Sequence, residues 1–190
     1  MRRIVTALIH IGLLLSCMSI QAETDIAGIR LSDSFTLGDH TLSLNGAGIR
    51  SKFVVKVYVG ALYVTKTSHD AAALLASSDP ASMQMHMLYK HVSAGKLVKG
   101  WTEGFKANLA EQDFNRLQAS IEQFNSMLPS LKEGDVVHMN FLPGRGTEVL
   151  VNEVSKGTVA GDDFFTALLA VWIGQQPADD ALKKGLLGTE

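Results

Sequence analysis

The chain has 190 residues, a formal net charge of −2 at neutral pH and a single cysteine. No run of lysine or arginine stands out, so we do not expect it to bind nucleic acid or an anionic membrane surface. One cysteine cannot close an internal disulfide, so the fold must depend on its apolar core. The length suits one domain, which we expect to be a monomer.

Residues 1–22 have the layout of a secretory signal peptide, with a basic start, an apolar run and Ala22 as the small residue before a cut. We therefore expect a periplasmic or secreted protein whose domain covers residues 23–190. The apolar run is too short to span a bilayer comfortably, and no later stretch is a better candidate for a transmembrane segment. The alternative is lipidation of Cys17, but the leucine before Ser16 fits a lipoprotein cleavage box poorly.

The first half of the mature chain predicts β-strands. Apolar and polar residues alternate in the early segments, with a turn at 38–39, and a later stretch is rich in β-branched and aromatic residues. Met83, Met85 and Met87 alternate with Gln84 and other residues, and this alternation continues to Tyr89. The predicted strands cover residues 29–31, 35–37, 42–44, 53–64 and 83–89.

The second half predicts mainly helices, because apolar residues recur there at spacings of three and four. A hairpin signal at 143–146 separates them, followed by a second turn signal at 156–157. The predicted helices cover residues 70–76, 93–105, 114–128, 164–172 and 178–186, and the predicted hairpin strands cover 136–141 and 148–154. Strands followed by helices indicate an α+β fold with an antiparallel sheet.

Three segments carry a resemblance to a known family: LNGAGIRSKFVVKVYVGALYV (44–64), LYKHVSAGKLVKGWTEGF (88–105) and FFTALLAVWIGQQPADDALKKGLLG (164–188). Together they resemble the chalcone isomerase-like proteins. The resemblance implies an open-faced β-sandwich, in which helices cover one side of a large antiparallel sheet. It also implies a ligand cleft between the sheet and the helices.

Arg50 is the first candidate site residue. A guanidinium beside an apolar strand can hold a carboxylate through two parallel hydrogen bonds, although a structural or surface role is the commoner one for an arginine. The resemblance favours the site. In plant chalcone isomerases the matching arginine holds the flavonoid, and in plastid fatty-acid-binding proteins it holds a lipid carboxylate together with a tyrosine that matches Tyr58.

The two side chains can meet only if the chain turns between them. On one straight strand Arg50 and Tyr58 would lie ~26 Å apart, at ~3.3 Å per residue. The required turn would fall near Ser51-Lys52. Tyr89 is a third candidate for a polar contact to the ligand, because it is predicted to share the sheet face of the methionines.

Other motifs point away from cofactors. Gly46-Ala47-Gly48 lacks the third glycine of a nucleotide-binding loop, so it predicts a tight turn instead. The histidines have no metal-ligand spacing, since His86 and His91 would point to opposite faces of a strand. We therefore expect neither a metal nor a cofactor.

The resemblance also predicts that the isomerase chemistry is lost. Leu97, Gly104 and Phe165 match positions that carry polar catalytic groups in the plant enzymes, and they cannot donate side-chain hydrogen bonds. We therefore predict a non-catalytic binding protein for a fatty acid or another small apolar carboxylate. The alternative is an intramolecular lyase or isomerase acting on an unsaturated ketone or acid. A third possibility is an interaction module whose cleft is filled by its own side chains.

Overall fold

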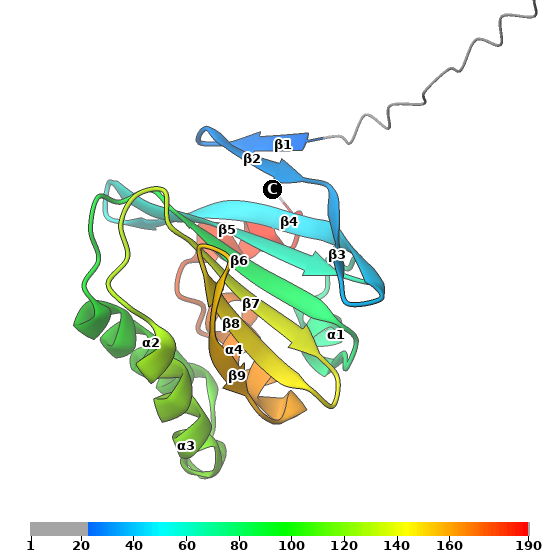
Figure 1. The fold of residues 1–190 in the computed structure, drawn as a ribbon, viewed down its shortest axis with the longest axis vertical. Helices are drawn as coiled ribbons and strands as arrows, with labels where there is room; N and C mark the ends of the chain where they lie inside the picture. The colour runs from blue at the N-terminus through cyan, green and yellow to red at the C-terminus, as the bar shows by residue number, and fades with distance from the viewer. Residues whose placement is uncertain (1–22, 190) are drawn as a thin grey trace, which may run out of the picture.

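The computed structural model describes residues 23–189, so the expected signal peptide and Cys17 lie outside the described residues. Within 23–189 the chain forms a seven-stranded antiparallel sheet with helices on one face (Figure 1). A separate two-stranded ribbon lies on the other face. The predicted α+β fold, with a large antiparallel sheet covered by helices, is confirmed.

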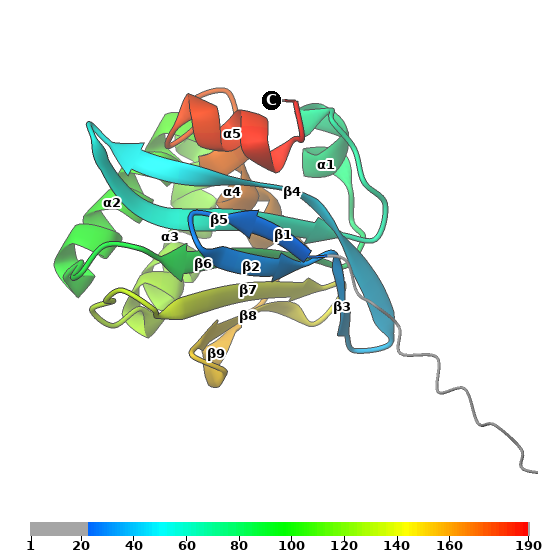
Figure 2. The same ribbon diagram turned by 90° about the horizontal axis from the view of Figure 1, so that it is seen from above.

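The strands of the large sheet follow one another in chain order, and each neighbouring pair is antiparallel. They are β3 (Ser34–Leu37), β4 (His40–Lys52), β5 (Val55–Val64), β6 (Ala81–Met87), β7 (Val136–Leu142), β8 (Gly146–Val151) and β9 (Val154–Val159). The ribbon consists of β1 (Glu23–Ile26) and β2 (Ile29–Ser32), which Figure 2 shows across the sheet.

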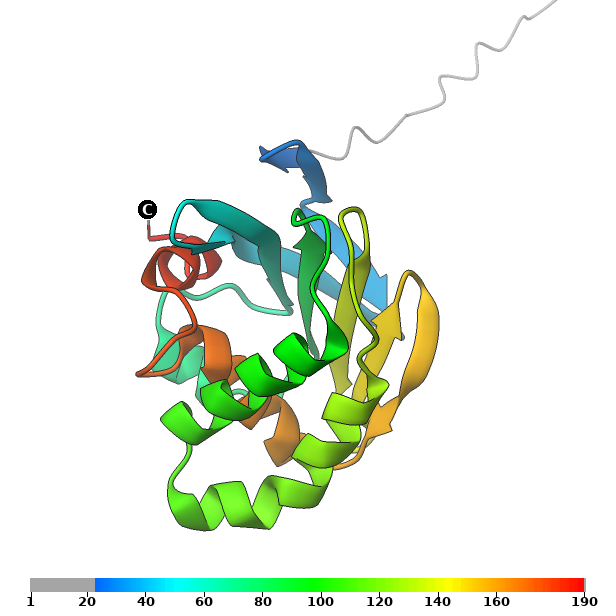
Figure 3. The same ribbon diagram turned by 90° about the vertical axis from the view of Figure 1, so that its left-hand side faces the viewer.

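The helices gather on one side of the sheet, as Figure 3 shows. They are α1 (Ala71–Ala76), α2 (Ala94–Asn108), α3 (Glu111–Met127), α4 (Asp162–Ile173) and α5 (Asp180–Leu186). All but one of the residues from Phe164 to Ile173 in α4 are buried, because α4 lies between the sheet and the other helices. Ser93 caps α2, since its hydroxyl accepts a hydrogen bond from the backbone N–H of Lys96. Within residues 23–189, no helix is both long and apolar enough to cross a bilayer.

Strand β5 has two buried faces. Tyr58 and Leu62 point toward the helices and belong to the main core. Val59, Ala61 and Tyr63 point the other way, into a smaller core beneath the β1–β2 ribbon. Alternate residues of a strand point to opposite faces, so burial on both faces explains why this stretch is almost continuously apolar.

The glycines at 46 and 48 do not form the predicted tight turn. They lie inside β4, where α5 packs directly on the strand (Figure 2). A Cβ on Gly46 would clash with the backbone oxygen of Gly185, and a Cβ on Gly185 would lie 2.8 Å from the Cα of Gly48. Close approach of a helix backbone therefore explains these glycines, and the turn prediction was wrong.

Three predicted strand boundaries were also wrong. Phe53 and Val54 form the turn between β4 and β5, so the strand predicted from residue 53 begins at Val55. Strand β6 ends at Met87, so Tyr89 is not part of it. After β8 the chain turns at Asn152 and Glu153, whose φ angles of 50° and 63° are left-handed.

The turn signal at 156–157 lies inside β9 instead. The register between β8 and β9 shifts between Val149 and Leu150, and Gly157, with a φ of 138°, is the partner of Val149. A glycine beside a register shift is typical of a β-bulge. The sequence signal was therefore genuine, but it marked an irregularity within a strand.

Candidate functional site

Arg50 and Tyr58 face one another across the β4–β5 hairpin, where they are register partners. The turn at Phe53 and Val54 reverses the chain, two residues beyond the predicted position at Ser51-Lys52. The ladder shifts register next to this pair, between Arg50 and Ser51. The guanidinium carbon of Arg50 lies 5.8 Å from the centre of the Tyr58 ring, a cation–π distance. The convergence that the site requires is therefore present.

The guanidinium of Arg50 has an unused donor. Its Nε is buried and has no hydrogen-bond partner among the described residues. No carboxylate of residues 23–189 lies within ion-pair distance of it. A buried donor that is left unpaired carries a desolvation cost of ~1–3 kcal/mol or more. A ligand oxygen that accepts this hydrogen bond would remove that cost.

Asp179 fixes the strand next to Arg50. One of its carboxylate oxygens accepts the backbone N–H of Ser51 at 3.0 Å. The other accepts the N–H of Leu182 at 3.0 Å and so caps α5. Because both oxygens bind backbone groups, Asp179 holds the end of β4 against α5. It forms no ion pair with Arg50, but its charge still acts at the site, since it contributes to raising the pKa of Tyr58.

Tyr58 is a buried phenol whose oxygen accepts a hydrogen bond from the indole N–H of Trp172 at 2.8 Å. Burial raises the pKa of Tyr58 above its usual value of 10.0, although Arg50 and the indole hydrogen bond oppose the shift. The phenol is therefore neutral at physiological pH. Its own proton stays available for donation to a ligand.

Two cavities meet at Arg50. The inner one, of about 80 Å³, lies between the sheet and α2. Its lining is Arg50, Val57, Tyr58, Met85, Met87, Val92, Lys96, Leu97, Gly100, Trp101, Val171 and Ala178. The outer groove, of about 570 Å³, runs along the hairpin and the start of α2. It shares Arg50, Val57, Val92, Lys96 and Gly100 with the inner cavity, so the guanidinium stands where one passes into the other.

Tyr89 lies at a different place from the one predicted. It lines the outer groove and not the inner cavity, and it is 37% exposed. Its backbone N–H donates to the carbonyl of Val57 at 3.1 Å. Tyr89 can therefore contact only the part of a ligand that lies in the groove.

The three residues matched to isomerase catalytic groups lie in three different environments. Leu97 lines the inner cavity, as expected. Gly104 does not line it; a Cβ there would lie 2.6 Å from Cγ1 of Val171, so the glycine permits close contact between α2 and α4. Phe165 stacks on Phe141 and lines a separate cavity beside α1, so it was wrongly matched to this site.

Three residues of the site were not predicted as such. Trp172 belongs to the helix predicted over residues 164–172, and its indole N–H donates to Tyr58. Asp179 and Lys96 were not singled out at all. The last helix was predicted from residue 178, so Asp179 fell inside it, whereas the helix begins at Asp180 with Asp179 as its cap. The bond from Asp179 to Ser51 joins residues 128 apart, which no local pattern shows.

The histidines form no metal site in the described part of the chain, since no three His, Cys, Asp or Glu side chains cluster there. His86 and His138 lie on neighbouring strands, on the sheet face away from the helices. Burial, followed by the proximity of His138, lowers the pKa of His86 to about 4. Both imidazoles lie on the sheet face opposite the one that Tyr58 faces.

The structure is similar to the crystal structure of a fatty-acid binding protein from Arabidopsis thaliana. The TM-score is 0.65 and the sequence identity is 14%, over 87% of this chain and 96% of that chain. At this identity the likeness establishes a shared fold. A comparison with curated proteins found no match.

A family profile described as chalcone isomerase-like matches residues 23–188. The match covers all the described strands and helices, together with the Arg50–Tyr58 pair. The resemblance carried by the three sequence segments is confirmed. The chain belongs to the chalcone isomerase-like family.

Proposed function

We propose that this chain is a monomeric, non-catalytic periplasmic protein that binds a fatty acid or another apolar carboxylate. The carboxylate binds Arg50 and Tyr58, and the apolar tail lies in the outer groove. The observation that carries the proposal is the buried, unpaired Nε of Arg50 at the junction of two cavities. The export signal expected in residues 1–22 is the basis for the periplasmic location.

The head-group chemistry follows from the two donors. Arg50 can offer Nε and a second N–H to the two oxygens of a carboxylate, which is the bidentate geometry that a guanidinium favours. Tyr58 can add its own O–H, since its oxygen already accepts from Trp172. Three donors favour an anion, and Arg50 adds a positive charge that opposes the nearby charge of Asp179.

The volumes favour the outer groove as the place of the tail. Small-molecule sites usually enclose ~300–1,000 Å³, and the inner cavity of about 80 Å³ is well below that range. The outer groove of about 570 Å³ lies within it. Its apolar side chains, Phe53, Val55, Val57 and Val92, suit an aliphatic chain. The inner cavity then receives only atoms close to the head group.

Catalysis is less well supported. An isomerase needs a group that moves a proton at carbon, placed within reach of the substrate. In the described structure the inner cavity, where the head group would bind, has no carboxylate or imidazole in its lining, and the Tyr58 phenol is held neutral. Glu103 and His91 line only the outer groove, beside the tail. The name of the Arabidopsis protein also supports a binding role, because that protein is a fatty-acid binding protein.

The second candidate is an interaction module without a small ligand. The observation that favours it is the small volume of the inner cavity, whose lining includes Trp101 packed against Trp172. The two candidates differ in one measurable property, because only the first predicts saturable binding of a fatty acid.

Isothermal titration of delipidated protein with a long-chain fatty acid tests the proposal. We expect Arg50→Ala to weaken binding at least ~10-fold, since a hydrogen bond to a charged group is worth ~1.5–3 kcal/mol. Tyr58→Phe should weaken binding less than Arg50→Ala does. Arg50→Lys should not restore full affinity, because lysine lacks the planar guanidinium whose two parallel N–H groups bind a carboxylate. Lys66→Ala, which removes a cation from the cavity beside α1, is the matched control and should bind as wild type does. Equal binding by wild type and Arg50→Ala, with both folded by circular dichroism, would refute the proposal.

A further inference from the structure

The cations of this chain are unevenly distributed. Residues 50–56 (RSKFVVK) and 88–99 (LYKHVSAGKLVK) contain no aspartate or glutamate, in a chain whose net charge is −2. They hold six cationic side chains: Arg50, Lys52, Lys56, Lys90, Lys96 and Lys99. We call these two segments together the basic tip.

The fold brings the two segments of the basic tip together. The carbonyl of Val57 accepts the backbone N–H groups of Leu88 and Tyr89, at 2.9 and 3.1 Å. Figure 1 shows the β4–β5 hairpin and the segment that leads from β6 to α2 on the same side of the molecule. Four of the cations line the outer groove: Arg50, Lys52, Lys96 and Lys99. The absence of a basic run in the sequence argued against an anionic membrane partner, but these cations cluster only when the chain folds, so we revise that expectation.

The acidic groups near the basic tip offset little of this charge. Glu103 lines the groove and lies 3.8 Å from Lys99, in an exposed pair that is worth little. Asp179 keeps its charge next to Arg50, but both of its oxygens bind backbone N–H groups and it is one carboxylate against six cations. Asp135, in the neighbouring loop, lies 3.8 Å from Lys132. No other ion pair in residues 23–189 includes a cation of the basic tip.

The basic tip also exposes apolar side chains. Of the five exposed large hydrophobic residues in the described chain, four belong to it. They are Phe53 at 94% exposure, Val54 at 96%, Val55 at 42% and Tyr89 at 37%. Single exposed apolar residues are ordinary, but a cluster at one projecting turn is typical of an interaction surface.

Folding alone does not explain Phe53. Its φ of 55° lies in the left-handed region, where glycine and asparagine are favoured and a bulky aromatic residue is an outlier. A phenyl ring that is 94% exposed also gains almost nothing from packing. A residue held in an unfavourable conformation without a packing gain points to a function outside the fold.

We propose that the basic tip docks on an anionic lipid surface. Phe53 and Val54 enter the boundary between head groups and acyl chains, and the lysines contact the lipid phosphates. A lipid surface fits better than nucleic acid, because two exposed valines gain from an apolar phase and cannot stack on bases. Docking would bring the mouth of the outer groove to the membrane, but it does not depend on the fatty-acid proposal.

Co-sedimentation with phosphatidylglycerol vesicles, compared with phosphatidylcholine vesicles, tests the docking. We expect wild type to prefer the anionic vesicles, and the preference to weaken as salt is raised. The double variant Lys56→Glu with Lys90→Glu should bind them at least ~20-fold more weakly, since each lysine is worth about fivefold. Neither lysine lines the inner cavity or the outer groove, so the affinity of the double variant for a fatty acid should equal that of wild type.

Phe53→Asn separates docking from folding. Asparagine suits the left-handed turn, so the melting temperature should stay equal or rise, while vesicle binding falls about tenfold. The matched control is Val154→Ser with Lys156→Glu, which makes the same kinds of change on β9, at the opposite edge of the sheet. It should bind as wild type does.

Three results would overturn the proposal. They are equal binding to both kinds of vesicle at low salt, an equal loss in the β9 control, and tighter binding to a single-stranded oligonucleotide than to vesicles. Loss of vesicle binding in the lysine variant with intact fatty-acid binding would support it. Fatty-acid binding that fails in wild type, with vesicle binding intact, would refute the proposed function alone.

Discussion

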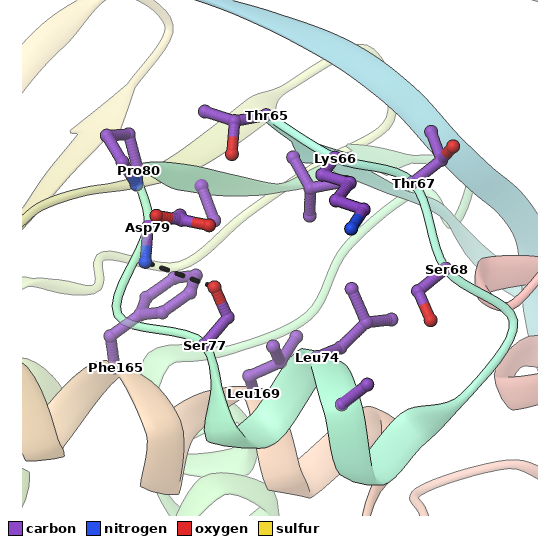
Figure 4. A pocket seen from close by; sticks show the side chains of 13 residues that line it. Thr65, Lys66, Thr67, Ser68, Leu74, Ser77, Asp79, Pro80, Phe165 and Leu169 are labelled. Carbon is purple, nitrogen blue, oxygen red and sulfur yellow. Dashed lines mark hydrogen bonds between the residues drawn. The ribbon is translucent and has the colours of Figure 1, made fainter.

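A cavity lies beside each end of β5, on the helix-covered face of the sheet. The two cavities differ in whether the polar groups around them have hydrogen-bond partners. Beside α1, at the Val64 end, lies a cavity of about 290 Å³ (Figure 4). Figure 4 shows Leu74, Leu169 and Phe165 along one side of it, with Lys66 and Ser77 among the polar groups around it. The inner cavity at the Arg50 end is much smaller, at about 80 Å³.

The smaller cavity is nevertheless the better candidate site. At the α1 end, the Ser77 hydroxyl accepts the N–H of Asp79 at 3.1 Å in an exposed turn, which is ordinary loop structure. At the other end, Arg50 has a buried N–H without a partner, beside the buried phenol of Tyr58. Unsatisfied buried donors indicate a ligand site more directly than volume does.

The largest expected effect concerns the strand that carries Arg50. Gly46→Ala should destabilise the protein by about 3 kcal/mol, because the added Cβ clashes with the backbone of α5. Gly95→Ala in α2 is the control, since nothing lies within 4 Å of the added carbon and alanine favours a helix by ~0.5–1 kcal/mol. Urea unfolding measures both. If the Gly46→Ala protein were as stable as wild type, α5 would not pack as closely on β4 as the structure shows.

The second effect compares one polar contact at each end. Tyr58→Phe should cost ~1–3 kcal/mol, because it leaves the indole N–H of Trp172 buried and unpaired. Ser77→Ala removes a hydrogen bond in an exposed turn and should change stability by less than ~0.5 kcal/mol. Equal losses in the two variants, measured by urea unfolding, would remove the contrast between the ends.

The smallest effect concerns the opposite face of the sheet, where His86 pairs with Val59. Burial lowers the pKa of His86 to about 4 in the folded protein, from 6.5 in the unfolded chain. The unfolded chain therefore binds more protons between these pH values, and stability should be lost as the pH falls from about 6.5 toward 4. Water screens this partly exposed group, so we expect under ~1 kcal/mol. His86→Gln should flatten the dependence of stability on pH, whereas Tyr58→Phe should leave it unchanged. If only Tyr58→Phe flattened it, the titrating group would lie beside Arg50 on the helix-covered face.

Local patterns predicted most of the fold, while contacts between distant segments remained hidden. The apolar spacing of α2 to α5 and the cap at Ser93 can be read within a few residues. The close packing of Gly46 against Gly185 joins segments more than a hundred residues apart. Seen in the sequence alone, the glycines at 46 and 48 therefore resembled a turn.

The candidate site shows the same division. Arg50 and Tyr58 were predicted, because the family resemblance named them. The bond from Trp172 and the clustering of the basic tip were not, since neither leaves a periodic signal in the sequence. The turn was placed near Ser51-Lys52 because the apolar pair Phe53-Val54 resembles the start of a strand.

The central claim, that Arg50 holds a carboxylate, is tested most directly by changing both partners. Isothermal titration would compare a fatty acid with the fatty alcohol of equal length, on wild type and on Arg50→Ala. We predict that Arg50→Ala weakens the acid at least ~10-fold and the alcohol less than about threefold, because only the carboxylate loses a charge-assisted hydrogen bond. Equal weakening of both ligands would contradict the claim and make Arg50 a structural residue.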